Sequence, residues 1–255
     1  MDTSFFSGIK PEYRQLSTGS QFAVPWCVYE CTAMMASFPA STVKVKELLP
    51  SKRLEPVQLV PGRAIIAVAA IEYRQHSDEK PFNEVSIMIP VIYQPRVNVP
   101  GIPLVFPEWF KRFGLYVYQI PVTTREAQVP GLEIWGVPKS IADITFRDSD
   151  EARSCTLSAD GRDVLTLSVK KLLTRRKRSN YWLYGVKDGR LLRFLNETQG
   201  YYGKARFARG ASLELGSHPT AERLKALNIG TAAAEYLYVT GMQSVLHLAD
   251  AVFDL

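Results

Sequence analysis

A lysine set among apolar residues is the group in this sequence best suited to covalent chemistry. Lys139 follows Gly136-Val137-Pro138, and its neighbours include Trp135 and several Ile, Val and Ala residues. Burial disfavours the charged form of an amine, and a neutral amine attacks a carbonyl carbon where an ammonium group does not. Pro138 fixes the backbone angle φ just before the lysine, and Gly136 permits a tight turn. Such a lysine is suited to forming a Schiff base with a small oxo acid.

A second interpretation of Lys139 stays open on these residues alone. The stem of the side chain could pack on Trp135 while the ammonium group reaches water at the start of a strand. Physical chemistry alone favours this second interpretation, because lysines almost always keep their charge in water. The choice between the two therefore depends on the wider pattern around the lysine.

The segment around Lys139 resembles the active-site segment of the acetoacetate decarboxylase family. The pattern that carries the resemblance is Gly131-x-Glu133-x-x-Gly136-x-Pro138-Lys139. The length of the chain and the order of its predicted strands and helices also fit, so the resemblance covers nearly the whole chain. In that family the lysine after the proline forms a Schiff base with the substrate ketone. The resemblance therefore implies a carboxy-lyase that uses Lys139 on a small oxo acid, without metal or organic cofactor.

The sequence departs from the decarboxylases of that family at several positions. Ser140 stands where they have a second lysine, Cys31 where they have a substrate-binding arginine, and Ala67 where they have a glutamate. The glutamate of the following strand is retained as Glu84. These departures argue against acetoacetate itself as the substrate. Decarboxylation of another β-keto acid therefore competes with aldol, dehydration or cyclisation chemistry on a 2-oxo acid such as pyruvate. A non-catalytic pocket for an apolar carbonyl compound is the remaining alternative.

Two carboxylates and three further residues complete the predicted site. Glu84 and Glu133 are predicted to move protons to and from the reacting groups. The alternatives are an exposed strand entrance for Glu84 and, for Glu133, a purely structural role in holding the lysine's loop. Arg125 could grip a substrate carboxylate in bidentate fashion or pair with the glutamate that follows it. Trp135 is predicted to line the substrate pocket, and Ser140 to hydrogen-bond the carbinolamine or a backbone group.

Other kinds of chemistry lack the motifs they need. The sequence contains no GxGxxG and no P-loop, so nucleotide cofactors are not expected. Its 3 cysteines form no CxxC pair, and the histidines are scattered, so no metal site is predicted. Cys27 and Cys31 are expected in the core.

The net charge of +6 is concentrated between Lys170 and Arg178. This segment lies between an alternating apolar run and an aromatic run, which predicts a loop joining two strands. A nucleic-acid surface needs basic residues spread over a face, or a known module. A solvated or subunit-facing loop is therefore expected, with no nucleic-acid partner.

Strand patterns dominate the chain. Runs rich in β-branched and apolar residues predict strands over residues 32–38, 63–73, 84–93 and 115–122. Asp160-Gly161 and Asp188-Gly189 predict hairpin turns, and apolar spacing predicts helices over 42–49, 218–227 and 243–255. Strands and helices do not alternate in the βαβ manner, so the prediction is an α+β, mainly antiparallel β fold in a single domain, residues 1–255. The family resemblance specifies this fold as a β-cone or barrel with a few peripheral helices.

No apolar stretch approaches the length of a membrane span, and the first residues lack the apolar core of a signal peptide. A cytoplasmic protein without membrane contact is therefore expected. The family resemblance implies a homo-oligomer, and the apolar residues between positions 99 and 110 could form an interface.

Overall fold

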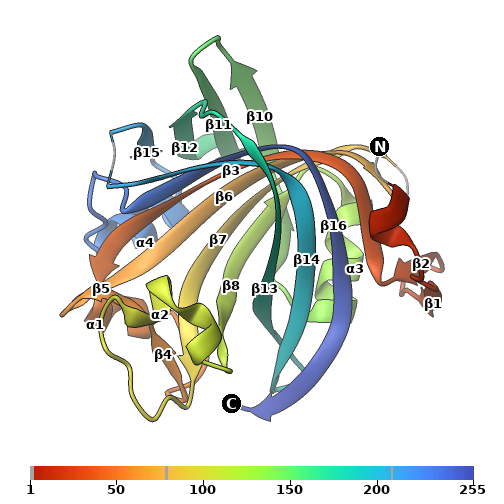
Figure 1. Cartoon of the computed structure of the whole chain (residues 1–255), viewed down its shortest axis with the longest axis horizontal. Helices are drawn as coiled ribbons and strands as arrows, with labels where there is room; N and C mark the ends of the chain where they lie inside the picture. The colour runs from red at the N-terminus through yellow and green to blue at the C-terminus, as the bar shows by residue number, and fades with distance from the viewer. Residues whose placement is uncertain (1–2, 78–79, 208) are drawn as a thin grey trace.

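Long strands that bend around a shared interior dominate the chain (Figure 1). The structure, a computed structural model, describes residues 3–77, 80–207 and 209–255. The longest strands form a closed barrel whose neighbours follow the order β7 (Phe82–Tyr93), β6 (Arg63–His76), β3 (Trp26–Ser41), β16 (Glu235–Asp254), β14 (Arg190–Arg206), β13 (Arg175–Lys187) and β8 (Phe113–Val122). β8 closes the ring, because it pairs antiparallel with β7 and parallel with β13.

Shorter elements extend the barrel or cover it. β4 (Leu54–Pro56), β5 (Gln58–Val60) and β9 (Lys139–Ile141) pair with β7, β6 and β8. A separate sheet has the order β10 (Asp143–Asp148), β11 (Ala152–Ala159), β12 (Arg162–Lys170), β15 (Ala211–Leu215). β1 (Glu12–Gln15) and β2 (Gln21–Val24) form a hairpin. The helices and single turns are η1 (Thr3–Phe6), α1 (Thr42–Lys46), α2 (Ile102–Val105), η2 (Pro107–Trp109), α3 (Arg125–Trp135) and α4 (Pro219–Ala226).

The alternation of side chains along the strands gives the molecule two cores. On β3 and β6, Met34, Phe38 and Ile66 face outward and pack with Leu165 and Leu167 of the separate sheet. The residues between them face the barrel interior, in a cluster that includes Ala33, Ala67, Ala69, Val239 and Phe194. Successive residues of a strand point to opposite faces, so strands buried on both sides read as continuous apolar runs. The outer core fixes the sheet against the barrel, and the inner core surrounds the cavity described below.

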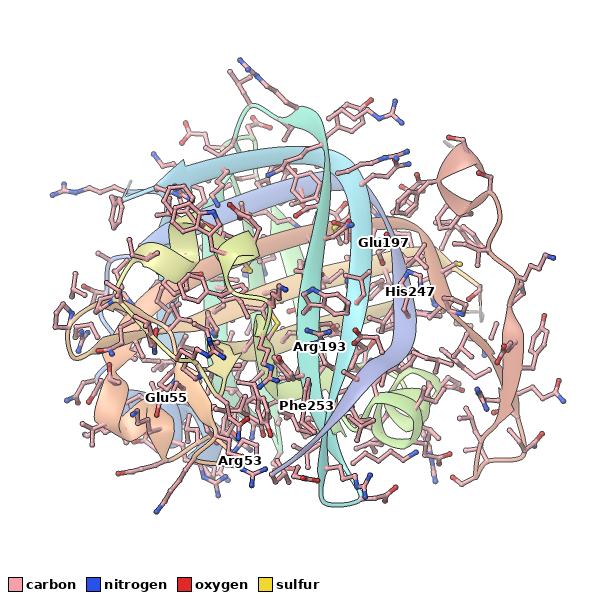
Figure 2. The ribbon with its side chains drawn as sticks, turned by 60° about the horizontal axis from the view of Figure 1, so that its bottom comes forward. Arg53, Glu55, Arg193, Glu197, His247 and Phe253 are labelled. Carbon is pink, nitrogen blue, oxygen red and sulfur yellow. The ribbon has the colours of Figure 1, made fainter. Side chains whose placement is uncertain are left out.

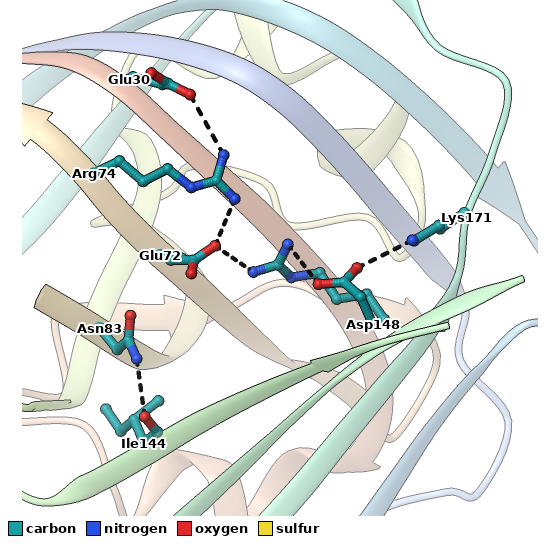
Figure 3. Close-up of polar contacts among 8 residues, drawn as sticks. Glu30, Glu72, Arg74, Asn83, Ile144, Asp148 and Lys171 are labelled. Atoms are coloured by element: carbon teal, nitrogen blue, oxygen red, sulfur yellow. Dashed lines mark hydrogen bonds and ion pairs between the residues drawn. The ribbon is translucent and has the colours of Figure 1, made fainter. Parts of the chain in front are cut away.

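A chain of ion pairs ties the separate sheet to the barrel (Figure 3). Its members, in order, are Glu30, Arg74, Glu72, Arg153, Asp148 and Lys171. Arg153 lies at the centre with a side chain that is 4% exposed, and its guanidinium nitrogens lie 2.6 Å from Glu72 Oε2 and 3.2 Å from Asp148 Oδ2. A buried guanidinium needs such partners, because an unpaired buried charge is strongly destabilising. β11 is therefore held to β6 by an electrostatic contact as well as by apolar packing.

Most predictions about the fold are confirmed. The fold class is α+β with mainly antiparallel strands, and the predicted strands lie within β3, β6, β7 and β8. The turns at Asp160-Gly161 and Asp188-Gly189 join β11 to β12 and β13 to β14, with all four residues at positive φ. The helix predicted from position 218 is α4, and α1 is shorter than predicted.

Three predictions about secondary structure are wrong. A helix was predicted over residues 243–255, but residues 243–254 lie in β16, because pairing with β14 and β3 outweighs the helical spacing of the apolar residues. Residues 175–178 of the basic segment belong to β13, so the loop is confined to residues 171–174. One βαβ unit does exist, since α3 connects β8 to its parallel neighbour β9. Within the described residues, no helix is long and apolar enough to cross a membrane.

The Arg153 contact predicts that stability depends on pH through Glu72. Burial alone would raise the pKa of the Glu72 carboxyl, but hydrogen bonds from Arg153 and Arg74 outweigh burial and hold that pKa below its ordinary value. The ionised carboxylate therefore stabilises the folded state above the unfolded-state pKa of about 4.3, and this contribution is lost as the pH falls through the lower folded-state value. We expect Glu72→Gln to reduce the free energy of unfolding by about 1–3 kcal/mol near neutral pH, with a difference from wild type that shrinks on acidification.

Urea unfolding of both proteins across this pH range measures the difference. Glu12→Gln is the matched control, because its pair with Arg14 is on the surface, at 71% and 53% exposed, where such pairs contribute about 0–1 kcal/mol. A Glu72→Gln effect that is equally small, or that does not depend on pH, would contradict the prediction.

Candidate active site

Helix α3 and the turn that follows it place the side chain of Lys139. Thr124 caps the helix, with its Oγ1 accepting from Ala127 N at 3.3 Å. The helix ends at Gly136, which adopts the left-handed conformation with φ of 63°. Val137 N then donates to Gly131 O at 3.1 Å, and the chain enters β9, where Lys139 is aligned with Ile120 of β8. Lys139 is therefore the first residue of a strand that pairs with β8 of the barrel.

Two glycines of the segment are required by close approaches. A Cβ atom on Gly131 would lie 2.5 Å from Cδ of Lys139, so the lysine stem crosses the helix at the one position without a side chain. A Cβ atom on Gly136 would lie 2.4 Å from Val186 O, where the end of α3 meets β13. The spacing of the motif thus has a physical reason. Gly131 leaves room for the side chain of Lys139, and Gly136 allows the end of α3 to pack against β13.

The amine of Lys139 meets the carboxylate of Glu84 inside the barrel. Lys139 Nζ lies 3.1 Å from Glu84 Oε2, and the two side chains are 10% and 7% exposed. Ser86, on the same face of β7, donates from its Oγ to Glu84 Oε1 at 2.9 Å. The amine also lies 5.6 Å from the centre of the Phe82 ring. A proton can pass directly between the amine and the carboxylate at this distance.

Protonated groups surround the Glu84 carboxylate. Tyr73 stacks on Phe82 with ring centres 4.5 Å apart, and burial, reinforced by Glu84, raises the pKa of its phenol well above the ordinary value. Burial likewise raises the pKa of the Cys31 thiol and of the Tyr181 phenol, with Glu84 contributing to both shifts. These groups keep their protons near neutral pH and can act as hydrogen-bond donors, but they supply no positive charge to replace the family's arginine.

The ion pair lies in the wall of a cavity of about 960 Å³ inside the barrel. Its lining comes from the inward faces of the barrel strands, from α3 and from the segment that holds α2 and η2. Trp135 and Arg125 both belong to this lining. Trp135 is buried and its indole nitrogen donates to His247 O at 2.8 Å, whereas Arg125 is exposed at the start of α3. The structure thus brings Lys139, Glu84, Trp135 and Arg125 to one cavity.

Glu133 lies elsewhere, which corrects its predicted role in proton transfer. Its carboxylate accepts hydrogen bonds from the Oγ and the backbone N of Ser17, and it is not part of the cavity lining. Those bonds hold the pKa of Glu133 below its ordinary value, the opposite of what a neutral proton donor needs. Its backbone oxygen accepts a hydrogen bond from Lys187 Nζ. Glu133 therefore fastens α3 to the N-terminal segment and to β13, the structural alternative considered from the sequence.

Ser140 is also placed away from the cavity. It is exposed and does not line the cavity, because successive side chains of a strand point to opposite faces and Lys139 takes the inward one. A hydrogen bond from Ser140 to the carbinolamine is therefore not supported by its position. Ala67 lines the cavity, and Cys31 belongs to the same inner core and donates from its thiol to Met242 O at 3.4 Å.

Tyr73 and Ser86 were missed in the sequence. Both lie on inward positions of predicted strands: Tyr73 ends the run that starts at Arg63, and Ser86 is two residues beyond Glu84.

His247 lies in β16 and pairs with Glu197 of β14, with its Nε2 2.9 Å from Oε2 of the glutamate (Figure 2). In the described part of the chain, no group of His, Cys, Asp and Glu side chains is arranged to hold a metal ion.

Gly131 offers a test of the lysine's placement. We expect Gly131→Ala to fold with lower stability, since the gain of about 1 kcal/mol from alanine in a helix interior is smaller than the cost of burying two charges without their partner. The new methyl group would displace the lysine stem and separate the amine from Glu84, so the rate of adduct formation with an oxo acid should fall by roughly tenfold or more. Thermal unfolding and borohydride trapping measure the two effects separately. Leu132→Ala, at a neighbouring exposed position of α3, is the control; equal trapping in both variants would show that Gly131 does not position the amine.

Comparison with known proteins agrees with this geometry. The chain matches the family described as acetoacetate decarboxylase over residues 11–254, whereas no curated protein matches it. Among solved structures, it is similar to an acetoacetate decarboxylase from Legionella pneumophila, with a TM-score of 0.62, 15% identity and coverage of 96% of this chain and 92% of the other. It is similar to the enduracididine biosynthesis enzyme MppR complexed with pyruvate, with a TM-score of 0.61, 12% identity and the same coverage of 96% and 92%.

A third similar structure is an acetoacetate decarboxylase-like enzyme from Sphingomonas wittichii RW1, with a TM-score of 0.53, 14% identity and coverage of 88% and 90%. At these identities the solved structures establish a shared fold, and the match over almost the whole sequence establishes the family. The resemblance seen around Lys139 is therefore confirmed: this chain belongs to the acetoacetate decarboxylase family.

Proposed function

We propose that this protein is a Schiff-base enzyme that decarboxylates a β-keto acid through Lys139. The observation that carries the proposal is the buried contact of 3.1 Å between Lys139 Nζ and Glu84 Oε2 at the wall of a large cavity. Family membership supports an enzymatic role. A lysine that only reached for water at a strand entrance would not be 10% exposed and bound to a buried carboxylate.

The contact accounts for activation of the amine. Transfer of a proton from Lys139 Nζ to Glu84 leaves a neutral amine, which attacks the ketone carbon of the substrate to form a carbinolamine. Return of a proton to the carbinolamine oxygen releases water and leaves an iminium cation on Lys139. Because the family's second lysine is replaced by an outward-facing serine, Glu84 is the group available to prepare the amine.

The iminium then accepts the electrons released with carbon dioxide. The bond between the α-carbon and the carboxylate breaks, its electron pair forms the enamine, and carbon dioxide leaves. Glu84 takes up a proton from water and delivers it to the α-carbon, which regenerates an iminium; water then hydrolyses the iminium to the ketone and the protonated lysine. The apolar walls favour the loss of carbon dioxide, because a buried carboxylate is costly whereas carbon dioxide is neutral.

The substrate carboxylate needs a partner before it is lost. Arg125, in the cavity lining at the start of α3, is the candidate. Its guanidinium group can hold a carboxylate with two parallel hydrogen bonds. Trp135 supplies an apolar wall near the lysine, and we propose binding roles for both residues.

A second function is favoured by one comparison. MppR, which shares the fold, has been solved with the condensation product of pyruvate and imidazole 4-carboxaldehyde. The same iminium on Lys139 would lose an α-proton to Glu84, and the resulting enamine would attack an aldehyde; this gives aldol condensation, and loss of water from the product gives dehydration. Measurement of carbon dioxide release from each trapped oxo acid separates the two functions, and absence of any adduct would favour a binding protein.

Lys139→Arg tests the covalent role of the lysine. Arginine keeps the positive charge and approximate length but forms no Schiff base, so borohydride trapping with a panel of oxo acids should give no adduct. Mass spectrometry of the trapped protein measures the result. Lys187→Arg is the matched control, because Lys187 bonds the backbone of α3 from outside the cavity. An adduct that persists in Lys139→Arg would exclude Lys139 as the nucleophile.

Glu84→Gln tests the proton transfer. The amide preserves size but cannot take a proton from the amine, so kcat should fall by roughly 10²–10⁴-fold, while Lys139 remains the residue that is slowly trapped. Ser86→Ala removes a hydrogen bond to the same carboxylate and should have a smaller effect. Equal activity of Glu84→Gln and wild type in single-turnover measurements would contradict the proposal.

A further inference from the structure

The ion pair of Lys139 and Glu84 lies near the start of β7, and the cavity lining continues along that strand to Pro90. β7 carries Glu84, then Ser86 and Met88 on the same inward face. Ser86 is aligned with Ala69 of β6, and Met88 with Ala67. With a rise of about 3.3 Å per residue, the distance along β7 from Glu84 to Met88 is about 13 Å. The cavity therefore extends away from the reacting amine for much more than the length of a small oxo acid.

Apolar side chains form most of the wall of this extension, together with Ser37, which is aligned with Ala67. Met35 comes from β3, Leu115 and Val117 from β8, and Leu237 and Val239 from β16. The segment with α2 and η2 adds Leu104, Pro107 and Phe110. At the level of Ala67 the lining also includes Lys204 and Glu235, but these neutralise each other in an ion pair of 2.6 Å. The walls between the amine and this pair offer little for a charged or strongly polar molecule.

Three inward-facing alanines leave space in the cavity that larger side chains would fill. Ala33 of β3 and Ala67 and Ala69 of β6 face the interior, at 9%, 1% and 6% exposed. Alanine is depleted in strands compared with β-branched residues, and the outward positions of the same strands carry large residues such as Met34 and Ile66. Alanines occur on both faces of these strands, since Ala36 and Ala70 belong to the outer core, but on the inward face each missing side chain adds to the cavity.

The volume agrees with a large ligand. At about 30 Å³ for each water-sized group, the cavity of about 960 Å³ holds on the order of thirty such groups. Ligand sites of this size and apolar character bind molecules of drug-like dimensions. Acetoacetate and pyruvate would leave most of the space to water against apolar walls.

We infer that the substrate of Lys139 is an oxo acid with a long or bulky apolar chain, which occupies the barrel interior between Ala69, Ala67 and Leu237. This inference rests on the proposed function, because it takes Lys139 as the point where the carbonyl carbon binds. It names the substrate class that the site selects. The reaction is the same as for a short β-keto acid, and the chain contributes binding energy along the strands.

A homologous series of ligands tests the inference. Straight-chain 2-alkanones from acetone to 2-undecanone are the probes, and calorimetric titration gives their dissociation constants with the full chain. We expect the affinity to rise about fourfold per methylene group, the factor that corresponds to about 0.8 kcal/mol for each buried CH₂, until the cavity is filled. The Lys139→Arg variant should show the same trend, because the chain binds the barrel walls and not the amine. No rise in affinity with chain length in either protein would overturn the inference.

Ala69→Leu tests the location of the chain. The larger side chain grows into the cavity, so the affinity for 2-undecanone should fall at least tenfold while the affinity for 2-butanone stays within about twofold. Ala251→Leu, on β16 but outside the cavity lining, should leave both unchanged. Equal losses for both ketones in Ala69→Leu would place the chain elsewhere and overturn the inference; the series in wild type remains decisive if this variant does not fold.

The two proposals can fail independently. If no oxo acid is trapped on Lys139 but affinity still rises with chain length, the proposed chemistry fails and the apolar site remains. If short oxo acids are trapped and turned over while chain length has no effect on binding or on kcat/KM, the chemistry stands and the substrate class is wrong.

Discussion

Closure of the barrel through β8 is the constraint on which the site depends. β8 pairs with β7 on one side and with β13 on the other, and the second pair is parallel. The next strand, β9, also runs parallel to β8, and parallel neighbours need a crossover connection, here α3. The crossover carries the chain over the barrel, so that Lys139 points inward at the start of β9. The position of the Lys139 amine is thus a result of strand topology.

Burial of Lys139 and Glu84 together sets the character of the interior. Each charge would be costly alone in apolar surroundings, and their mutual contact offsets part of that cost. Ser86 supports the carboxylate, while buried phenols nearby retain their protons. The pair of Lys139 and Glu84 is therefore a buried polar contact in a cavity wall that is mainly apolar.

Local sequence patterns predicted most of the strands and the directed side chain of Lys139. They did not predict contacts between elements that are far apart in the sequence. Runs of β-branched residues predicted β6 and β7, and the glycines and proline around Lys139 indicated an aimed side chain. Glu133 was misplaced because its contact with Ser17 joins residues far apart in the chain. Ser140 was misplaced because the direction of side chains in β9 depends on its pairing with β8. The final strand was mistaken for a helix because its apolar spacing fits both structures, and only its pairing partners decide between them.

A closed barrel has no free edge of its own, so open edges belong to the smaller sheet, to the β1–β2 hairpin and to the short strands that extend the barrel. In the described residues, β10 and β15 are the outer strands of that sheet. An edge strand presents unpaired backbone groups to any other chain, and charged side chains discourage such pairing. β10 carries Asp143, Arg147 and Asp148 along its short length. The edge of this sheet at β10 lies close to the cavity, because Ile144 O accepts a hydrogen bond from Asn83, the neighbour of Glu84. The charges along β10 therefore oppose edge-to-edge aggregation beside the site itself.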